Sequence, residues 1–324
     1  MERVKLEVRM EWERTRHGEG LVCREGNDEN MEQVKAKTIV TRTKNDWWFG
    51  TNYGMNIYRG CSFGCIYCDS RSDCYRVEDF GRVRVKGEAL RIIRDDLRRK
   101  KNKGVIHTGA MSDPYTPAEE SMKLMRHSLE LINAYRFGVA IATKNTLVTR
   151  DIDVLQDIST RAPVTVSLTI TTVDDDLAKK IEPYSPSSSE RFSALKELAD
   201  AGLFCGVLMM PILPFINDTE ENVLQMVRLA SEAGAKYVYG HMGLTLREGQ
   251  REFFYDHLDQ NFPGLKEKYM TTYGNKYQAD SPQSRRLYNV FQDECKRLGL
   301  LYKMEDITAE YQKDGFWAQQ LSLF

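Results

Sequence analysis

The chain has 324 residues, of which 41% are hydrophobic, and this content is enough to build a sizeable core. Its 46 basic and 47 acidic residues leave a net charge of −1, which excludes attraction to nucleic acid or membranes by the overall field. Seven cysteines, three of them within eight positions, favour metal or redox chemistry over a disulfide framework. The sequence contains no apolar stretch of membrane-spanning length and no signal peptide, so we expect a soluble, cytoplasmic protein.

Short apolar segments alternate with amphipathic helical segments from about residue 56 onwards, and this alternation predicts a parallel sheet with crossover helices. The expected strands are 56–60, 104–109, 137–143, 164–169, 203–210 and 236–242. The expected helices are 88–101, 117–134, 150–160, 188–201 and 219–233. Six strand–helix units do not complete an eight-fold barrel, so we expect an α/β fold of partial (β/α)6 barrel type, with its site at the carboxyl ends of the strands.

The domain organisation follows from where this alternation begins and ends. Residues 1–50 are charged and weakly patterned and form an N-terminal extension, and residues 51–248 form the partial barrel. Residues 249–319 form a helical, aromatic-rich C-terminal extension with a final helix near 284–298, and residues 320–324 form a separate tail.

Three cysteines, Cys61, Cys65 and Cys68, follow the first expected strand with the spacing C-x3-C-x2-C. Thiolates are soft ligands, and a tight loop lets three of them converge on one iron–sulfur cluster. Three protein ligands leave one iron of a four-iron cluster open to a substrate or cofactor. A structural zinc site is the alternative, because Cys74 lies close enough in sequence to supply a fourth ligand.

This motif, with Tyr67 before its last cysteine and six strand–helix units behind it, resembles the radical S-adenosylmethionine (radical SAM) superfamily. Residues 56–247 are similar to one branch of it, the proteins related to spore photoproduct lyase. The resemblance implies a [4Fe–4S] cluster held by the three cysteines. It also implies reductive cleavage of S-adenosylmethionine (SAM) to a 5′-deoxyadenosyl radical, which abstracts hydrogen from a substrate.

The resemblance also implies which residues bind SAM. Ser112 and Asp113, in the loop after the second expected strand, match the pair that accepts hydrogen bonds from the cofactor's ammonium group. Lys144, at the end of the third, matches a lysine that pairs with its carboxylate. The remaining cofactor-binding candidates are the aromatic Tyr67 of the cysteine motif, Ser167 and Thr169 on the fourth strand and Met209 on the fifth.

One position departs from the lyase pattern. Spore photoproduct lyase has a cysteine hydrogen donor two residues before its Ser–Asp pair, and this chain has Ala110 there. The same repair cycle is therefore not expected. The candidates for a replacement donor are Cys74, Tyr115, Tyr239 and His241.

The last five residues, Gln320, Leu321, Ser322, Leu323 and Phe324, resemble the pentapeptide by which bacterial polymerases and repair proteins dock on the sliding clamp. The tail favours DNA as the substrate. A basic run at 98–103 could neutralise phosphates but fits a solvated helix end better, so it is weak evidence for DNA. An electron donor such as flavodoxin or ferredoxin is also implied. Two alternatives remain open: a radical SAM maturase of a peptide, protein or RNA whose tail packs on its own core, and a non-catalytic zinc or iron–sulfur module that binds nucleic acid.

Overall fold

A curved sheet of seven strands lies at the centre of the computed structural model, which describes residues 12–14, 21–23 and 31–313. Six strands are parallel, and β4 adds to β5 in antiparallel orientation. In spatial order the strands are β12 (Tyr237–Gly240), β11 (Cys205–Met209), β10 (Val164–Thr169), β9 (Gly138–Thr143), β8 (Val105–Thr108), β5 (Tyr53–Met55) and β4 (Val40–Arg42). The first and last strands do not pair, so the barrel is open and the expected α/β class is confirmed.

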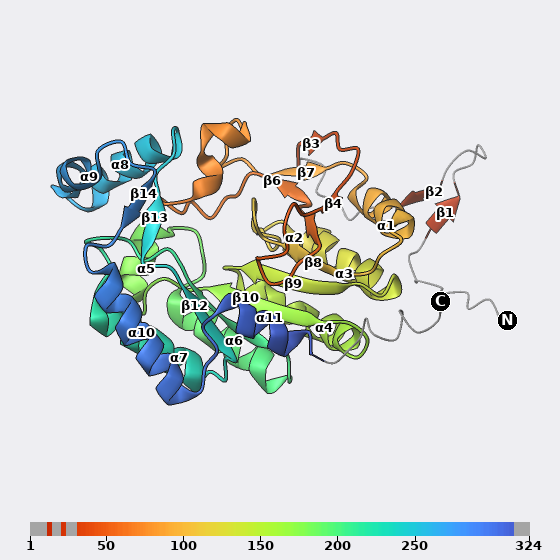
Figure 1. The fold of residues 1–324 in the computed structure, drawn as a ribbon. Coiled ribbons are helices and arrows are strands. Elements are labelled where there is room, and N and C mark those ends of the chain that lie inside the picture. The colour runs from red at the N-terminus through yellow and green to blue at the C-terminus, as the bar shows by residue number, and fades with distance from the viewer. Residues whose placement is uncertain (1–11, 15–20, 24–30, 314–324) are drawn as a thin grey trace.

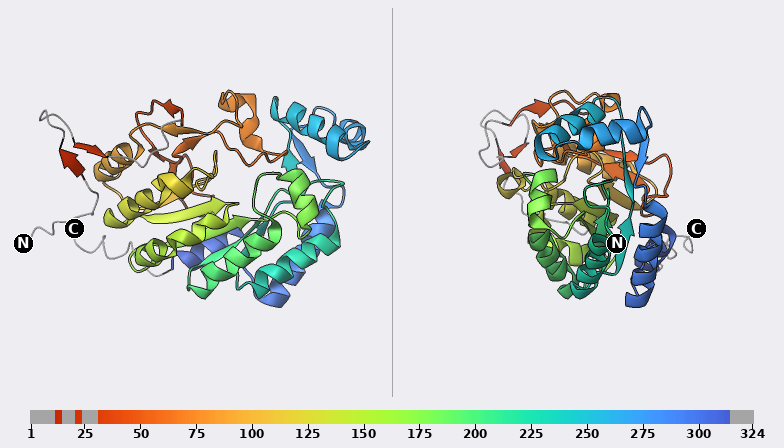
Figure 2. Two further views of the ribbon diagram at one scale, coloured as in Figure 1. Left: turned by 180° about the vertical axis from the view of Figure 1, so that it is seen from behind. Right: turned by 90° about the vertical axis from the view of Figure 1, so that its left-hand side faces the viewer.

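Helices cover the outer face of this sheet (Figures 1 and 2). They are α1 (Ala89–Arg99), α3 (Leu124–Ala134), α4 (Ile152–Ser159), α6 (Ser188–Asp200) and α7 (Glu220–Glu232). Each helix buries one apolar face; in α6 this face includes Leu195 and Leu198. A capping box between Ser187 and Glu190 satisfies the free N–H groups at the start of α6.

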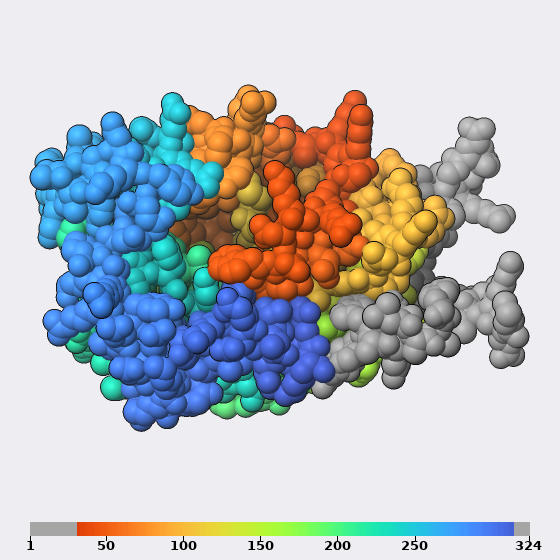
Figure 3. All heavy atoms as spheres, viewed as in Figure 1, coloured from red at the N-terminus to blue at the C-terminus, as the bar shows by residue number. Residues whose placement is uncertain are grey.

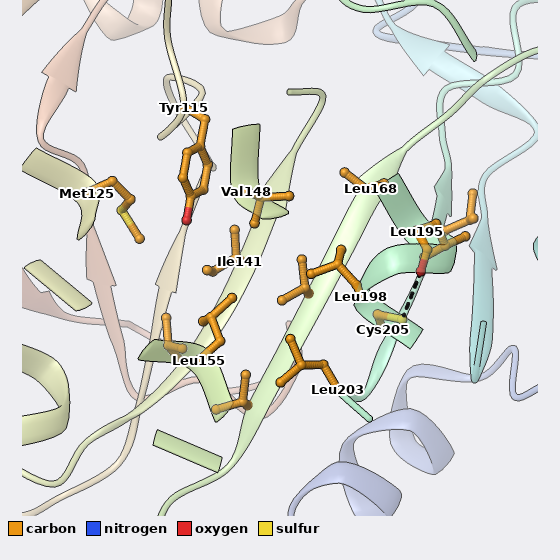
Figure 4. Close-up of a cluster of buried hydrophobic side chains, with 14 of the residues drawn as sticks. Tyr115, Met125, Ile141, Val148, Leu155, Leu168, Leu195, Leu198, Leu203 and Cys205 are labelled. Atoms are coloured by element: carbon orange, nitrogen blue, oxygen red, sulfur yellow. Dashed lines mark hydrogen bonds between the residues drawn. The ribbon is translucent and has the colours of Figure 1, made fainter. Parts of the chain in front are cut away.

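The outer core lies between these helices and the sheet. It includes Leu168, Leu195, Leu198 and Leu203, whose side chains are labelled in Figure 4. Cys205 is buried in the same layer, and its thiol lies 3.8 Å from the carbonyl oxygen of Leu195.

Two boundaries differ from the sequence-based expectation. The first barrel strand is Tyr53–Met55 rather than 56–60, because Tyr58–Arg59 leaves the sheet as β6 and pairs with β7 (Arg84–Lys86), which in turn pairs with β3 (Gln33–Val34). The helix expected at 117–134 is broken at Lys123, whose φ is 50°, into α2 (Glu119–Met122) and α3.

Three further differences concern short elements. The helix expected at 150–160 begins with a 3-10 turn, η3 (Thr146–Asp151). Helix α5 (Asp175–Ile181) was not expected; Asp174 caps it by accepting hydrogen bonds from the backbone N–H groups of Asp176 and Leu177. Two turns that follow the cysteines, η1 (Asp69–Arg71) and η2 (Asp73–Tyr75), were not expected either.

The C-terminal region packs beside the barrel. It comprises β13 (Gly243–Thr245), α8 (Gln250–Asn261), α9 (Leu265–Tyr273), β14 (Gln278–Asp280), α10 (Ser284–Leu298) and α11 (Met304–Tyr311). Helix α10, expected at 284–298, packs on α7, whereas β13 and β14 form an antiparallel pair. Near the N-terminus, β1 (Trp12–Arg14) pairs with β2 (Leu21–Cys23).

Helix α11 closes the barrel at the amino-terminal end of its strands. Its buried residues Met304, Ile307 and Tyr311 pack with Phe49 of the β4–β5 loop and with Tyr237 of β12, which come from opposite edges of the sheet. The Tyr311 hydroxyl donates a hydrogen bond to the carbonyl oxygen of Phe49. Among the described helices, none is both long and apolar enough to cross a membrane.

Candidate active site

A cavity of about 290 Å³ lies at the carboxyl ends of the strands. Its walls are the cysteine loop, the loops after β8 and β9, the ends of β10 and β11, and residues 241–245. Figure 3 shows the surface hollowed between the orange N-terminal third of the chain and the cyan and blue segments that follow β12. This is the end of the barrel where the sequence predicts the site.

The cysteines of the motif, Cys61, Cys65 and Cys68, all line this cavity. Gly60 starts their loop with φ +84°, and a Cβ there would lie 2.5 Å from the carbonyl oxygen of Arg82, so only glycine fits. The loop therefore turns sharply out of β6 and presents three sulfur atoms to the same space.

Burial keeps these thiols neutral in the absence of metal. It raises the pKa of Cys61 to about 11, with a further contribution from Asp113, and it raises the pKa of Cys65 and Cys68 as well. The Lys144 ammonium acts in the opposite direction on Cys65 and Cys68. Three soft sulfur ligands on one loop, with a cation beside them, fit a bound cluster that displaces the thiol protons.

Cys74 does not join this group. It is exposed on η2, and its sulfur accepts a hydrogen bond from Nη1 of Arg247 at 3.3 Å. Arg247 is in turn 3.1 Å from Asp69. The cavity therefore offers three cysteines, and the fourth ligand required by the zinc alternative does not come from Cys74.

The loop after β8 places Ser112 and Asp113 in the cavity wall. The Ser112 hydroxyl donates to the carbonyl oxygen of Gly60 at 2.5 Å, which leaves its oxygen able to accept. Asp113 accepts from the Thr143 hydroxyl at 2.6 Å and from the backbone N–H of Lys144 at 2.8 Å. Burial raises the pKa of Asp113 despite these donors.

Lys144 follows β9 and also lines the cavity, with its Nζ 5.6 Å from the centre of the Tyr67 ring. Burial by itself would lower the pKa of Lys144, but Glu182, and Cys65 when it is deprotonated, raise it. Lys144 is therefore a cation at neutral pH, as pairing with a carboxylate requires.

Strand alternation decides which residues of β10 and β11 reach the cavity. Thr169 lines it, whereas Ser167 lies one layer deeper on the same face and hydrogen-bonds to the Tyr237 hydroxyl at 2.7 Å. Met209 packs in the outer core, and Met210 lines the cavity instead. The expectations for Ser167 and Met209 as wall residues are therefore corrected.

Of the four candidate hydrogen donors, only His241 lines the cavity. Tyr115 is buried in the outer core, where its hydroxyl donates to Asp151 at 3.1 Å (Figure 4). Tyr239 packs edge-on against Trp48, with ring centres 5.6 Å apart. Tyr115, Tyr239 and Cys74 therefore lie outside the cavity wall.

A buried charged pair that the sequence pattern does not predict supports the cysteine loop. Glu182 and Arg191, each with a side chain 1% exposed, lie 2.5 Å apart. Glu182 accepts a hydrogen bond from the Tyr67 hydroxyl, and Arg191 donates to the carbonyl oxygen of Thr169 at 2.8 Å. Burial would raise the pKa of Glu182, but Arg191 and Lys144 hold it below its usual value.

The contacts Tyr67–Glu182–Arg191–Thr169 thus connect the cysteine loop to the end of β10. The neighbouring sequence gives little indication of this arrangement. Glu182 follows a seven-residue helix, and Arg191 lies in the first turn of α6, where the sequence pattern does not distinguish it from a solvent-exposed arginine.

Comparison with known proteins agrees with this geometry. Residues 55–230 match the family model "Radical SAM superfamily". The chain belongs to the radical SAM superfamily. Members of this superfamily bind a [4Fe–4S] cluster and SAM, and these are the cofactors of this chain.

Among similar sequences, an uncharacterized protein of Methanocaldococcus jannaschii is 34% identical over 233 residues, covering 71% of this chain and 83% of that one. An uncharacterized protein of Mycobacterium tuberculosis is 30% identical over 250 residues, covering 75% and 73%.

Among solved structures, spore photoproduct lyase with bound AdoMet and dinucleoside spore photoproduct has a similar fold. Its TM-score is 0.61 at 13% identity, with 84% of this chain and 81% of that chain covered. The radical SAM methyltransferase TsrM from Kitasatospora setae has a TM-score of 0.50 at 12% identity, covering 76% and 51%. The radical SAM fold expected from the sequence is therefore confirmed.

Proposed function

We propose that this protein is a cytoplasmic enzyme that cleaves SAM reductively and abstracts a hydrogen atom from DNA in a repair or modification reaction. The observation that carries this proposal is one cavity that holds the three cysteines together with Asp113 and Lys144. When bound, the reduced cluster and SAM supply a 5′-deoxyadenosyl radical.

The chain's own residues hold the cofactor. Lys144 is placed to pair with the carboxylate of the methionyl group. Oδ2 of Asp113 accepts one hydrogen bond from the Lys144 backbone, so it keeps a lone pair for the ammonium group, and the Ser112 oxygen offers another acceptor.

Apolar side chains exclude water and competing hydrogen donors from the same space. Phe63, Phe80, Met210 and Leu244 line the cavity, and this part of the wall offers a radical no exchangeable hydrogen. Ala110 is also part of the wall, and its methyl side chain has no S–H or O–H hydrogen to donate to a radical. We therefore infer a reaction cycle that does not use the lyase cysteine. Of the candidate hydrogen donors, His241 is the one that lies in the cavity wall.

An aromatic group at the open edge of the barrel supports nucleic acid as the substrate. The ring centres of Trp47 and Trp48, from the β4–β5 loop, lie 6.4 Å and 5.6 Å from that of Tyr239 on β12. These rings therefore connect the two edges of the open sheet. The Trp47 side chain is 56% exposed and presents its indole to solvent. None of the three rings is part of the cavity wall. An exposed aromatic ring at the open edge of the barrel is nevertheless suited to stacking on unpaired bases.

The test is anaerobic reconstitution with iron and sulfide, followed by an assay for 5′-deoxyadenosine with dithionite as reductant. Deuterated DNA is then added, and mass spectrometry detects deuterium in the 5′-deoxyadenosine. We expect SAM cleavage and label transfer. A reconstituted protein that leaves SAM intact would contradict the radical chemistry. SAM cleavage without deuterium transfer from any DNA tested would contradict DNA as the substrate.

Two cysteine variants form a matched pair. We expect Cys65→Ala to lose the cluster and SAM cleavage, because it removes one of three ligands on the cavity wall. Cys74→Ala should keep the full iron content, because its sulfur faces Arg247 outside the cavity. Iron and sulfide analysis with an absorbance scan measures both, and loss of the cluster in the Cys74 variant would make Cys74 a ligand.

The clamp-binding tail, residues 320–324, lies outside the described residues, and recruitment by the sliding clamp stays a proposal. It is supported by the match of the five-residue sequence alone. Deleting Gln320–Phe324 should abolish binding to purified clamp and leave SAM cleavage unchanged, and equal binding of both forms would contradict it.

A further inference from the structure

Tyr184 lies directly on the cysteine loop and is highly exposed. At 72%, it is the most exposed large hydrophobic side chain among the described residues. Its backbone N–H donates to the carbonyl oxygen of Phe63 at 3.2 Å. Its ring covers Gly64, where a Cβ would lie only 2.8 Å from ring atom Cδ2. One side of the ring therefore contacts the backbone between two cluster ligands while the rest faces solvent.

A basic surface adjoins Tyr184. A hollow of about 490 Å³ is lined by Lys179, Lys180 and Pro183, together with Asp176 of α5 and His257 and Asn261 of α8. Neither lysine makes an ion pair with any residue that the structure describes. Pro183 of this hollow is the chain neighbour of Tyr184, so the exposed ring lies at the border of a surface with two lysines that have no ion-pair partner among the described residues.

This surface lies outside the cavity that takes SAM. Tyr184, Lys179 and Lys180 are absent from the cavity wall. The cavity is hollowed into the face of Figure 3, whereas Figure 2 (left) shows α5 beside α8 on the face seen from behind. With SAM and substrate filling the cavity, an electron has to reach the cysteine loop from another side. At Gly64 the loop backbone is covered by the side chains of Tyr184 and Pro183.

We propose that Tyr184, Lys179 and Lys180 form the docking surface for an acidic one-electron carrier protein. This proposal rests on the proposed function. In the docked complex the reduced carrier loses one electron and the cluster held by Cys61, Cys65 and Cys68 gains it, so that no bond forms and no proton moves. Unpaired lysines steer an acidic partner towards the surface, and an exposed aromatic ring supplies apolar contact at its centre.

The experiment compares two reductants on the reconstituted protein. Stopped-flow absorbance follows bleaching of the cluster by reduced flavodoxin, an acidic carrier, and by dithionite, which needs no docking surface. For the double variant Lys179→Glu and Lys180→Glu we expect the flavodoxin rate constant to fall by about 10-fold or more at low salt. The dithionite rate should stay unchanged, and added salt should slow the wild type more than the variant.

Matched controls and a second readout complete the test. Tyr184→Ala should also slow the flavodoxin reaction, whereas Lys296→Glu on α10 and Met270→Ala on α9, which are also exposed but lie elsewhere, should not. Carbodiimide cross-linking, with or without cluster, should join carrier carboxylates to Lys179 or Lys180 with loss of water, as peptide mapping would show.

Equal flavodoxin rates for the wild type and the charge-reversed variant would overturn the docking surface. If the variant also slows with dithionite, the cross-link map decides, and carrier cross-links that avoid both lysines overturn the proposal. Failure of the proposed function is a separate outcome, because it would appear as a wild-type cluster that is reduced by dithionite but leaves SAM intact.

Discussion

At the scale of single residues, the site depends on buried charges that are matched with one another. Glu182 and Arg191 are both 1% exposed; Oε2 of Glu182 faces Arg191, and Oε1 accepts a hydrogen bond from the Tyr67 hydroxyl. A buried pair of this kind gains little over an apolar pair, yet removing one partner leaves an uncompensated charge. The pair therefore holds Tyr67, and with it the cysteine loop, in one position.

We predict that Arg191→Met lowers the free energy of unfolding by about 3–5 kcal/mol, because Glu182 is left charged and buried. The double variant Arg191→Met and Glu182→Leu should recover much of this loss. Urea unfolding of the cluster-free protein under anaerobic conditions measures both. Losses that simply add in the double variant would show that the two side chains do not act as a pair.

At the scale of elements, β8 carries a histidine into the barrel interior. His107 is buried, with its Nδ1 3.2 Å from the carbonyl oxygen of Ala140 and its ring 6.2 Å from that of Trp48. Burial lowers the pKa of His107 to about 4. The folded protein therefore holds this histidine neutral at a pH where the unfolded chain binds a proton.

The pH dependence follows from this difference. The contribution of His107 to stability is complete above about pH 6.5, the ordinary histidine pKa, and is lost as the pH falls towards about 4. Between about pH 7 and about pH 5 the loss is about 2 kcal/mol. We predict that His107→Leu removes this part of the pH dependence in urea unfolding. An unchanged difference between the two pH values would assign it to other groups.

At the scale of the whole molecule, the open barrel is completed by segments far apart in the sequence. The β4–β5 loop and α11 fill the space between the two edges of the sheet, with Phe49, Ile307 and Tyr311 in contact. The backbone N–H of Phe49 lies 3.2 Å from the sulfur of Met304. The sequence places α11 in a helical extension, but the structure makes it part of the barrel core.

We predict that Ile307→Ala lowers the free energy of unfolding by about 2–5 kcal/mol, because Ile307 is fully buried in this group. Glu310→Ala, an exposed change on the same helix, should stay within about 0.5 kcal/mol. Similar effects of the two variants in urea unfolding would show that α11 is not part of the cooperative core.

The sequence by itself determined the features that depend on local pattern. Alternating apolar and amphipathic segments define the α/β barrel, because each strand or helix leaves its own periodicity in the chain. The spacing of Cys61, Cys65 and Cys68 defines the cysteine loop, because the three ligands lie within eight residues of one another.

Only the tertiary structure decided the features that depend on distant contacts. Alternation along β11 allows either Met209 or Met210 to face the cavity, and only packing of the helices against the sheet selects Met210. The Tyr67–Glu182 contact joins residues 115 positions apart, which no local periodicity records. Burying one charge destabilises the fold unless its partner is buried beside it, and only folding of the whole chain brings Glu182 and Arg191 together.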